Sequence, residues 1–212
     1  MSEELKQYLC QFRSTDPKWM QDLQEQAKNQ RVPIMEKDSL TFMLHLLRIH
    51  KPKRILEIGT AIGYSALCMA DTCPQAEIVT IEKDSQRYKE AVLNIQKLSM
   101  SDKIEIVYGD AREVLPGLSD TAPFDFVFID AAKGQYQNYF GQAVRLLTQT
   151  GVIVSDNVLF RGFVYGKVDI PTRYQSMVTK IRHYNEWLMQ HPDFHTTIVP
   201  LGDGLAISSK KK

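Results

Sequence analysis

The chain has 212 residues, enough to bury the core of one folded domain, and its 43% hydrophobic and 24% charged residues are close to the globular average, which argues against a disordered or fibrous protein. Its 26 basic and 25 acidic residues leave a formal charge of +1, which argues against a non-specific nucleic-acid coat. Three cysteines without metal-ligand spacing argue against a zinc site or a disulfide framework and fit a reducing compartment.

The first residues, MSEELKQYLC, lack the basic start and apolar run of a signal peptide. No stretch of the sequence approaches the roughly eighteen apolar residues that a membrane span requires. We therefore expect a cytoplasmic protein without a membrane partner.

The N-terminal region is predicted to be helical. Spaced apolar residues in 2–30, interrupted at Pro17, predict two helices that meet near this proline. Residues 32–39 (VPIMEKDS) read as a loop, and residues 39–49 as a mostly buried helix that ends at the Lys51-Pro52 pair. We interpret 1–212 as one domain, with a helical extension over 1–50 and a core over 51–212.

From residue 54 onward, short β-branched runs alternate with segments long enough for crossover helices, which predicts an α/β fold with a mostly parallel sheet and helices on both faces. The Gly-Asp-Gly turn in TTIVPLGDGLAISSK predicts a hairpin and an antiparallel last strand. Strands are expected at 54–59, 76–82, 103–110, 124–130 and 151–157, and helices at 63–71, 85–98, 111–118, 137–147 and 174–190.

A glycine-rich segment, Glu57-Ile-Gly59-Thr-Ala-Ile-Gly63-Tyr-Ser65, joins the first of these strands to its helix, where glycines permit a tight turn close to a ligand. Such turns also occur for packing alone. Glu82 ends the next strand, where a carboxylate can accept the hydroxyl hydrogens of a ribose. Because Ala61 replaces the middle glycine of dinucleotide motifs, a pyrophosphate fits poorly, and S-adenosylmethionine is favoured over NAD.

Asp110 follows the third strand in the sequence YGDA. A carboxylate beside Ala111 suits the edge of an adenine base. Asp110 is equally suited to be the N-cap of the following helix, and one residue can serve both purposes.

Three oxygen-bearing side chains, Asp130, Asp156 and Asn157, follow two strands that we expect to be adjacent. Such a set suits Mg²⁺, or Ca²⁺ or Mn²⁺ as substitutes, and not Zn²⁺, and it leaves positions open for water and substrate oxygens. The alternative is that these residues only cap turns. Lys133 lies one turn beyond Asp130 and is either a solvated surface lysine or, with a pKa lowered beside a metal, the base that takes the substrate's proton.

The segments VPIMEK, LEIGTAIGYS, IEKD, YGDA, FIDAAKGQYQNYF and SDNVLFRG resemble those of the cation-dependent O-methyltransferases that include catechol and caffeoyl-CoA O-methyltransferases. The resemblance runs from about Val32 to the end of the chain. Within that family, GQYQNYF, DNVLFRGFV and HPDF followed by VPLGDGLAISSKK are most similar to the bacterial tRNA 5-hydroxyuridine methyltransferases.

The resemblance implies a Rossmann-like class I methyltransferase fold with a seven-stranded sheet, and a homodimer. It implies that Asp130, Asp156 and Asn157 hold Mg²⁺, that Lys133 is the base, and that Glu57 and Gly59 shape the floor of the S-adenosylmethionine site. The residues implied to line that site are Met35, Ser65, Glu82, Asp110, Ala111 and Asp130.

The function implied is O-methylation of 5-hydroxyuridine at the wobble position of the tRNA anticodon loop, giving 5-methoxyuridine, with no role for DNA. The alternative is a small catechol-like or caffeoyl-CoA-like hydroxyl compound. An NAD-dependent oxidoreductase and a non-catalytic S-adenosylmethionine-binding module explain the Asp-Asp-Asn set less well. An RNA substrate predicts a basic and aromatic surface, which could equally be core with a solvated rim; it would include Phe160, Arg161, Phe163, Tyr165, Lys167 and Arg173.

Overall fold

The computed structural model describes residues 3–12, 15–166 and 169–211. Three helices precede the sheet, as expected: α1 (Glu3–Cys10), α2 (Lys18–Gln30) and α3 (Lys37–His50). Pro17 is the N-cap of α2, where a missing N–H has no cost. Helix α3 ends at His50, and its C-cap Lys51 takes the left-handed conformation (φ 52°) just before Pro52.

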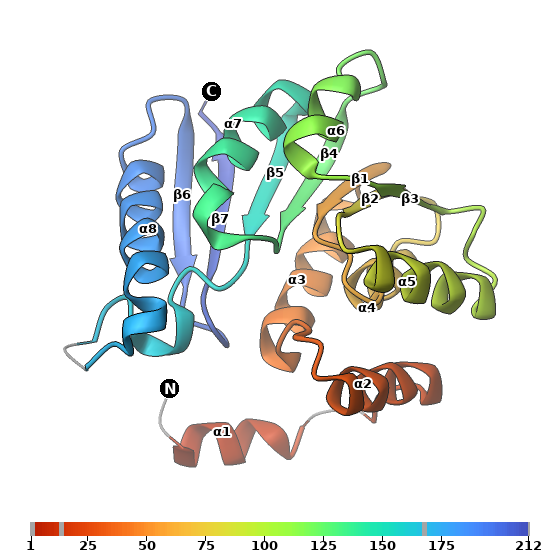
Figure 1. Ribbon diagram of the computed structural model, residues 1–212, viewed down its shortest axis with the longest axis horizontal. Coiled ribbons are helices and arrows are strands. Elements are labelled where there is room, and N and C mark those ends of the chain that lie inside the picture. Colours follow the sequence, from red (N-terminus) through yellow and green to blue (C-terminus); the bar gives the residue numbers. More distant parts are fainter. Residues whose placement is uncertain (1–2, 13–14, 167–168, 212) are drawn as a thin grey trace.

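Within the described residues, the strands form one seven-stranded sheet with the order β3-β2-β1-β4-β5-β7-β6 (Figure 1). Parallel pairing joins β3 to β2, β2 to β1, β1 to β4 and β4 to β5, whereas β7 runs antiparallel to both β5 and β6. The predicted mostly parallel sheet with an antiparallel last strand is therefore confirmed. The strands are β1 (Arg54–Ile58), β2 (Glu77–Glu82), β3 (Ile104–Tyr108), β4 (Phe124–Ile129), β5 (Leu147–Ser155), β6 (Phe194–Val199) and β7 (Leu205–Lys210).

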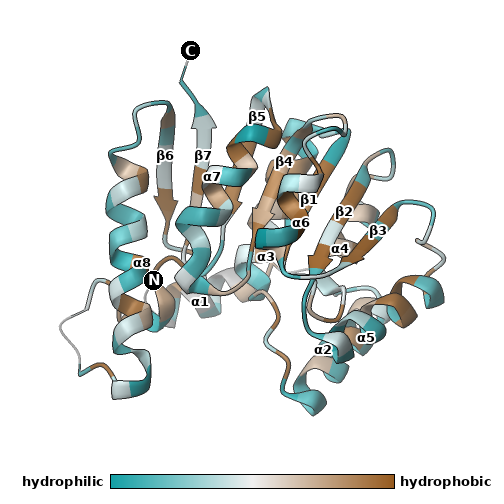
Figure 2. Cartoon of the chain, turned by 45° about the horizontal axis from the view of Figure 1, so that its top comes forward, coloured by the Kyte–Doolittle hydropathy of each residue, from teal (hydrophilic) through white to brown (hydrophobic). Residues whose placement is uncertain are grey.

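Helices cover both faces because successive strand residues point to opposite sides. Ile55 and Phe126 pack with α2, α3, α4 (Tyr64–Thr72) and α5 (Ser85–Lys97). Leu56 and Val127 pack on the other side with α6 (Ala111–Gly117), α7 (Tyr136–Leu146) and α8 (Thr172–Met189). Figure 2 shows the result: the parallel strands β1, β2, β3 and β4 are hydrophobic over much of their length, β6 and β7 are less so, and the helices carry hydrophilic residues outward.

The structure differs from the expected elements mainly around β5. This strand begins at Leu147 rather than at residue 151, because the pairing with β4 shifts register between Phe124 and Phe126 and so includes the polar stretch TQTG, which has no strand pattern of its own. A short 3₁₀ helix, η1 (Lys133–Gln135), also precedes α7.

The chain order of the strands reverses between β1 and β4, so the carboxyl ends of these parallel strands open a crevice at one edge of the sheet. In the described part of the chain, no helix combines the length and apolar character that a bilayer span needs. The division into one domain and the cytoplasmic location stay predictions.

Candidate functional site

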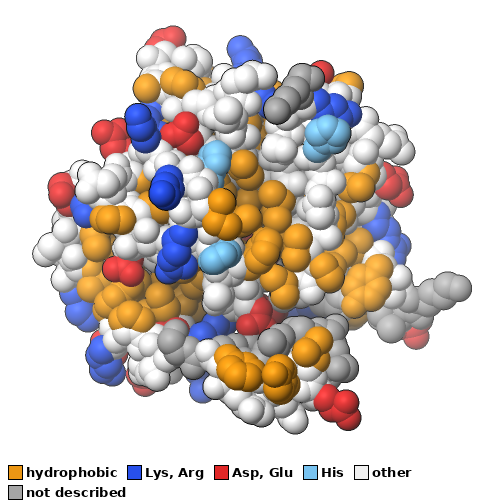
Figure 3. All heavy atoms as spheres, turned by 180° about the vertical axis from the view of Figure 1, so that it is seen from behind, with side chains coloured by type: hydrophobic (Ala, Val, Ile, Leu, Met, Phe, Trp, Pro, Cys, Tyr) orange, Lys and Arg blue, Asp and Glu red, His pale blue; other side chains and the backbone are white. Residues whose placement is uncertain are grey.

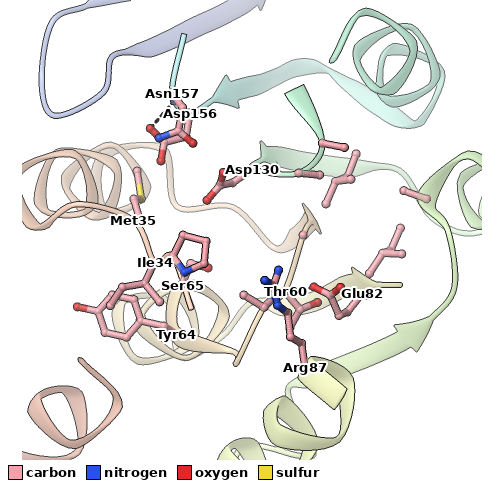
Figure 4. A pocket seen from close by; sticks show the side chains of 18 of the residues that line it. Ile34, Met35, Thr60, Tyr64, Ser65, Glu82, Arg87, Asp130, Asp156 and Asn157 are labelled. Atoms are coloured by element: carbon pink, nitrogen blue, oxygen red, sulfur yellow. Dashed lines mark hydrogen bonds between the residues drawn. The ribbon is translucent and has the colours of Figure 1, made fainter. Parts of the chain in front are cut away.

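A cavity of about 420 Å³ lies at the carboxyl ends of β1, β2, β4 and β5. Its walls come from the turns that follow these strands, from the loop over residues 33–36 and from Asp203 in the β6–β7 turn. Figure 4 shows two groups of polar side chains in it: Asp130, Asp156 and Asn157 at one end, and Glu82 with Thr60 and Arg87 at the other. We call these the metal end and the nucleoside end.

Gly59 brings the turn after β1 against the end of β4. Its φ is 105°, and a Cβ on it would lie 2.1 Å from the carbonyl oxygen of Asp130, so no side chain fits at this position. The close packing of Gly59 against the Asp130 backbone places the turn after β1 directly beside the metal end.

Glu82 is held at the nucleoside end through both of its carboxylate oxygens. The backbone N–H of Ala61 donates to Oε2 and that of Asp84 donates to Oε1, each at 2.8 Å. Ala61 adopts the left-handed conformation (φ 47°) that glycine favours, and this turns its N–H toward Glu82. Each oxygen keeps a second lone pair, with which it can accept a hydroxyl from a ligand.

Glu57 lies beneath the cavity and is fully buried. Ser65 Oγ and Thr80 Oγ1 each donate a hydrogen bond to one of its oxygens at 2.5 Å. Burial raises the pKa of Glu57 to about 7, although these two hydrogen bonds oppose the shift. Glu57 itself does not line the cavity, but it holds Ser65, which does. This position beneath the cavity is compatible with the expected role of Glu57 in shaping the floor of the site.

The metal end combines two carboxylates and an amide. Asp156 is 1% exposed; its Oδ1 accepts from the N–H of Asn157 at 2.7 Å, and its Oδ2 is buried without a hydrogen-bond partner among the described residues. Burial and the neighbouring charge of Asp130 raise the pKa of Asp156 above its usual range. Asn157 has φ 58°, a conformation that asparagine tolerates better than most residues.

A hard divalent cation fits this end. A buried carboxylate oxygen without a partner is costly, and a cation bound to it removes that cost. Among the described residues, no group of three or more His, Cys, Asp or Glu side chains is placed to hold a metal. The candidate donors at this end would be oxygens of Asp130, Asp156 and Asn157, which are of the type that Mg²⁺ prefers.

Lys133 forms an ion pair with Asp130, with 2.7 Å between Nζ and Oδ1. Its side chain is 16% exposed, so it is not the solvated surface lysine of the alternative interpretation. Lys133 lines the cavity beside the three oxygen donors.

Asp110 is the N-cap of α6, and its side chain accepts from the N–H of Arg112. The Arg112 guanidinium binds both carboxylate oxygens, at 3.0 and 2.8 Å, and lowers the pKa of Asp110 to about 2. Gly109 and Ala111 line the cavity, whereas Asp110 is not among its lining residues. The capping interpretation is confirmed, and a contact between its carboxylate and adenine stays a prediction.

Sequence reasoning missed several lining residues, among them Tyr64, Arg87 and Asp203. Tyr64 lies inside the glycine-rich segment, which was a usable signal; its hydroxyl accepts from Gln24 Nε2 of α2 at 2.8 Å. Arg87 and Asp203 follow no motif. Asp203 Oδ1 accepts from the N–H of Arg161 at 2.9 Å and thereby ties the β6–β7 turn to the segment after β5.

That segment carries an aromatic and cationic group. The rings of Phe160, Phe163 and Tyr174 lie 5.4 to 6.1 Å apart, and the guanidinium groups of Arg161 and Arg173 lie 5.8 and 4.6 Å from the Tyr174 ring. We call these five residues the aromatic-arginine cluster. Tyr165 beside it is 74% exposed. Lys167, which we expected in this surface, lies outside the described residues.

Comparisons with known proteins agree with this geometry. A family model described as O-methyltransferase matches residues 11–211. The chain is 30% identical to a caffeoyl-CoA O-methyltransferase of Populus kitakamiensis, covering 97% of this chain and 93% of that protein. It is 33% identical to a catechol O-methyltransferase of Mycobacterium tuberculosis, over 74% of this chain and 70% of that protein.

Among solved structures, the S-adenosylhomocysteine-bound methyltransferase of Podospora anserina superposes with a TM-score of 0.89 at 26% identity, covering 100% of this chain and 97% of that one.

Proposed function

The chain belongs to the O-methyltransferase family, and from this membership we propose that it transfers a methyl group from S-adenosylmethionine to a hydroxyl that has a second oxygen beside it. The observation that carries the proposal is that one cavity holds a ribose-type carboxylate, Glu82, at one end and three cation ligands at the other. The methyl donor would bridge the two ends.

The nucleoside end supports S-adenosylmethionine. Glu82 would accept the ribose hydroxyls with the lone pairs that Ala61 and Asp84 leave open. Gly109 and Ala111 would border the base, and Met35 and Ser65 line the remaining wall. A relative bound to S-adenosylhomocysteine, the product of such a transfer, supports the same assignment.

At the metal end, Asp130, Asp156 and Asn157 would hold Mg²⁺, which acts as a Lewis acid on hydroxyl oxygens. Lys133 lies beside these ligands, where its ammonium is paired with Asp130. Once a bound cation takes over the Asp130 carboxylate, the amine would lose its proton to solvent and, in its neutral form, would accept the proton of the substrate hydroxyl. The loop over residues 33–36 forms part of the cavity wall and would limit the access of water from that side. The transfer then needs the hydroxyl oxygen, the methyl carbon and the sulfur in line.

Two substrate classes offer the required pair of oxygens. The named relatives act on caffeoyl-CoA and catechol, which supports a small catechol-like or caffeoyl-CoA-like compound most directly. The second candidate is 5-hydroxyuridine in the tRNA anticodon loop, whose C5 hydroxyl and C4 carbonyl form an equivalent pair.

The aromatic-arginine cluster favours this second candidate. It borders the cavity, since Arg161 is bonded to Asp203, and Tyr165 beside it is exposed. RNA bases in loops are bound by stacking on aromatic and guanidinium planes, and phosphates by cations. A buried phenol pocket has no need of exposed arginines.

One experiment separates the candidates. The protein is incubated with labelled S-adenosylmethionine and Mg²⁺, once with tRNA from cells that lack this gene and once with catechol. Formation of 5-methoxyuridine in digested tRNA, at a rate above that of catechol methylation, supports the RNA substrate. A higher rate on catechol contradicts it, and no transfer to either excludes both of these substrates.

A homodimer also stays a proposal, supported by an apolar stripe on α3. Phe42, Leu46 and Ile49 share one helical face, and Ile49 is 68% exposed. Figure 3 shows hydrophobic side chains gathered near the centre of the face opposite to that of Figure 1. Sedimentation of wild type and of Ile49→Glu tests it: a dimer that the substitution splits agrees, and a monomeric wild type contradicts it.

A further inference from the structure

Tyr136, the first residue of α7, is 1% exposed and lies among α7, α8, β4 and β5. A buried phenol hydroxyl requires a hydrogen-bond partner. Here the hydroxyl donates to the backbone carbonyl of Asp156 at 3.0 Å. The bond therefore fixes the main chain of the residue whose Oδ2 has no partner in the described part of the chain.

The main chain needs such a fixed point at Asp156. The last sheet bond of this segment toward β4 runs from the N–H of Asp156 to the carbonyl of Ile129 at 3.0 Å. The chain then turns at Asn157, with φ 58°, and leaves the sheet. The Tyr136 hydroxyl binds the Asp156 carbonyl, which lies between the last sheet bond at the Asp156 N–H and the turn at Asn157. The backbone at this position sets the directions of the Asp156 and Asn157 side chains.

Tyr136 also contacts Lys133, in two ways. Its backbone N–H donates to the carbonyl of Lys133, which closes η1. Its ring lies 5.5 Å from the Lys133 ammonium, within the range of a cation–π contact. The ammonium is thus held between the Tyr136 ring and the Asp130 carboxylate, to which it is bonded at 2.7 Å.

Tyr184 of α8 provides a natural comparison. It is 2% exposed, its ring lies 5.4 Å from that of Tyr136, and its hydroxyl is 2.7 Å from Ser155 Oγ, one residue before Asp156. It has the same chemistry and burial as Tyr136, but its hydroxyl bonds to the side chain of Ser155 rather than to Asp156.

From these contacts we propose that Tyr136 is a positioning residue for methyl transfer: its hydroxyl fixes the main chain of the metal ligand Asp156, and its ring and N–H fix the base Lys133. This inference rests on the proposed function, because it assumes a cation at the metal end. Residues that orient metal ligands typically account for about 10- to 100-fold in metal affinity or activity.

The test compares Tyr136→Phe with Tyr184→Phe. Each variant keeps the ring and loses one buried hydroxyl, so we expect both to stay folded with melting temperatures lowered by about 2–4 °C. Mn²⁺ binding, followed by electron paramagnetic resonance of the free ion, should weaken by about tenfold or more in Tyr136→Phe and stay within about twofold of wild type in Tyr184→Phe. The kcat of Tyr136→Phe should fall with the KM for S-adenosylmethionine unchanged.

The outcomes separate the inference from the function on which it rests. If wild type binds Mn²⁺ and Tyr136→Phe binds it equally well, the positioning role is wrong while the metal site stands. If Tyr184→Phe loses as much affinity as Tyr136→Phe, the effect is a general loosening of the core, and the inference is again wrong. If wild type itself binds no Mn²⁺, the metal site assumed in the proposed function is contradicted.

Discussion

The two ends of the cavity differ in how far the protein satisfies its own polar groups. At the nucleoside end, both oxygens of Glu82 accept backbone N–H groups, and both oxygens of the buried Glu57 accept hydroxyls. At the metal end, Oδ2 of the buried Asp156 has no partner among the described residues, and Asp130 is paired with a lysine.

This difference indicates which end of the cavity has its polar groups satisfied before a ligand binds. A carboxylate held through hydrogen bonds keeps its direction in the free protein, so the nucleoside end is preorganised. A buried oxygen without a partner is destabilising and gains its partner when a cation binds. Substitutions at the metal end should therefore reduce activity more than stability, and those at the nucleoside end should reduce ligand affinity.

The largest effect is expected for Asp156→Asn. Replacing a charged cation ligand by a neutral amide should weaken metal binding and lower methyl transfer by at least about 10³-fold, since Lewis-acid stabilisation amounts to several kcal/mol. Chelation of the metal from wild type should do the same. The melting temperature of the metal-free variant should equal or exceed that of metal-free wild type, because a buried charge has been removed. Radiometric transfer assays and thermal unfolding measure the two quantities.

Asp125→Asn is the matched control, at the opposite end of β4 and β5. Asp125 Oδ2 accepts from the N–H groups of Lys53 and Arg54 at 2.8 and 3.1 Å. This variant should lose stability and keep its activity, the reverse of Asp156→Asn. Full activity of Asp156→Asn in the presence of chelator would contradict the assignment of a metal end.

Lys133→Met should lower kcat by about 100-fold or more, since general-base catalysis typically contributes that much. The affinity for S-adenosylmethionine, measured by calorimetry, should not change, because Lys133 contacts Asp130 rather than Glu82. Lys180→Met is the control. The Lys180 side chain, from α8, lies beside Gly134 of η1, the 3₁₀ helix that contains Lys133, but it does not line the cavity. A kcat near that of wild type for Lys133→Met would exclude it as the base.

Glu82→Gln acts at the preorganised end. It removes the charge that strengthens hydrogen bonds to ribose, about 1.5–3 kcal/mol, so the Kd for S-adenosylmethionine should rise by about 10- to 100-fold. At saturating cofactor, kcat should be nearly that of wild type. Glu77→Gln, at the other end of β2 with a 75% exposed side chain, should change neither value. Unchanged cofactor affinity in Glu82→Gln would place the ribose elsewhere.

Much of this comparison could be predicted from the sequence. Short β-branched runs end at Glu82, Asp130 and Asp156, and parallel strands bring their carboxyl ends to one edge of the sheet. The convergence of these side chains therefore follows from local pattern and topology. The binding of a divalent cation was inferred from the types of these residues and stays a proposal.

Contacts between distant segments could not be predicted in this way. Gln24 and Tyr64 are 40 residues apart, and Arg161 and Asp203 are 42 apart, with no periodicity that links them. Among the described residues, one side-chain oxygen of Asp156 accepts the N–H of Asn157 and the other has no partner, while the Asp156 carbonyl accepts the hydroxyl of Tyr136. These features are fixed by tertiary packing, on which local sequence carries little information.

The smallest effect is expected for Asp110→Ala, which sharpens the comparison at the edge of the nucleoside end. Loss of an N-cap costs about 1 kcal/mol, or about 2–4 °C in melting temperature for a chain of this size. Asp84→Ala, which removes the cap of α5, should cost as much. Because Arg112 binds both oxygens of Asp110, we expect its cofactor Kd to change by less than about threefold, as for Asp84→Ala. A tenfold rise confined to Asp110→Ala would instead mean that this carboxylate leaves Arg112 and binds the adenine edge.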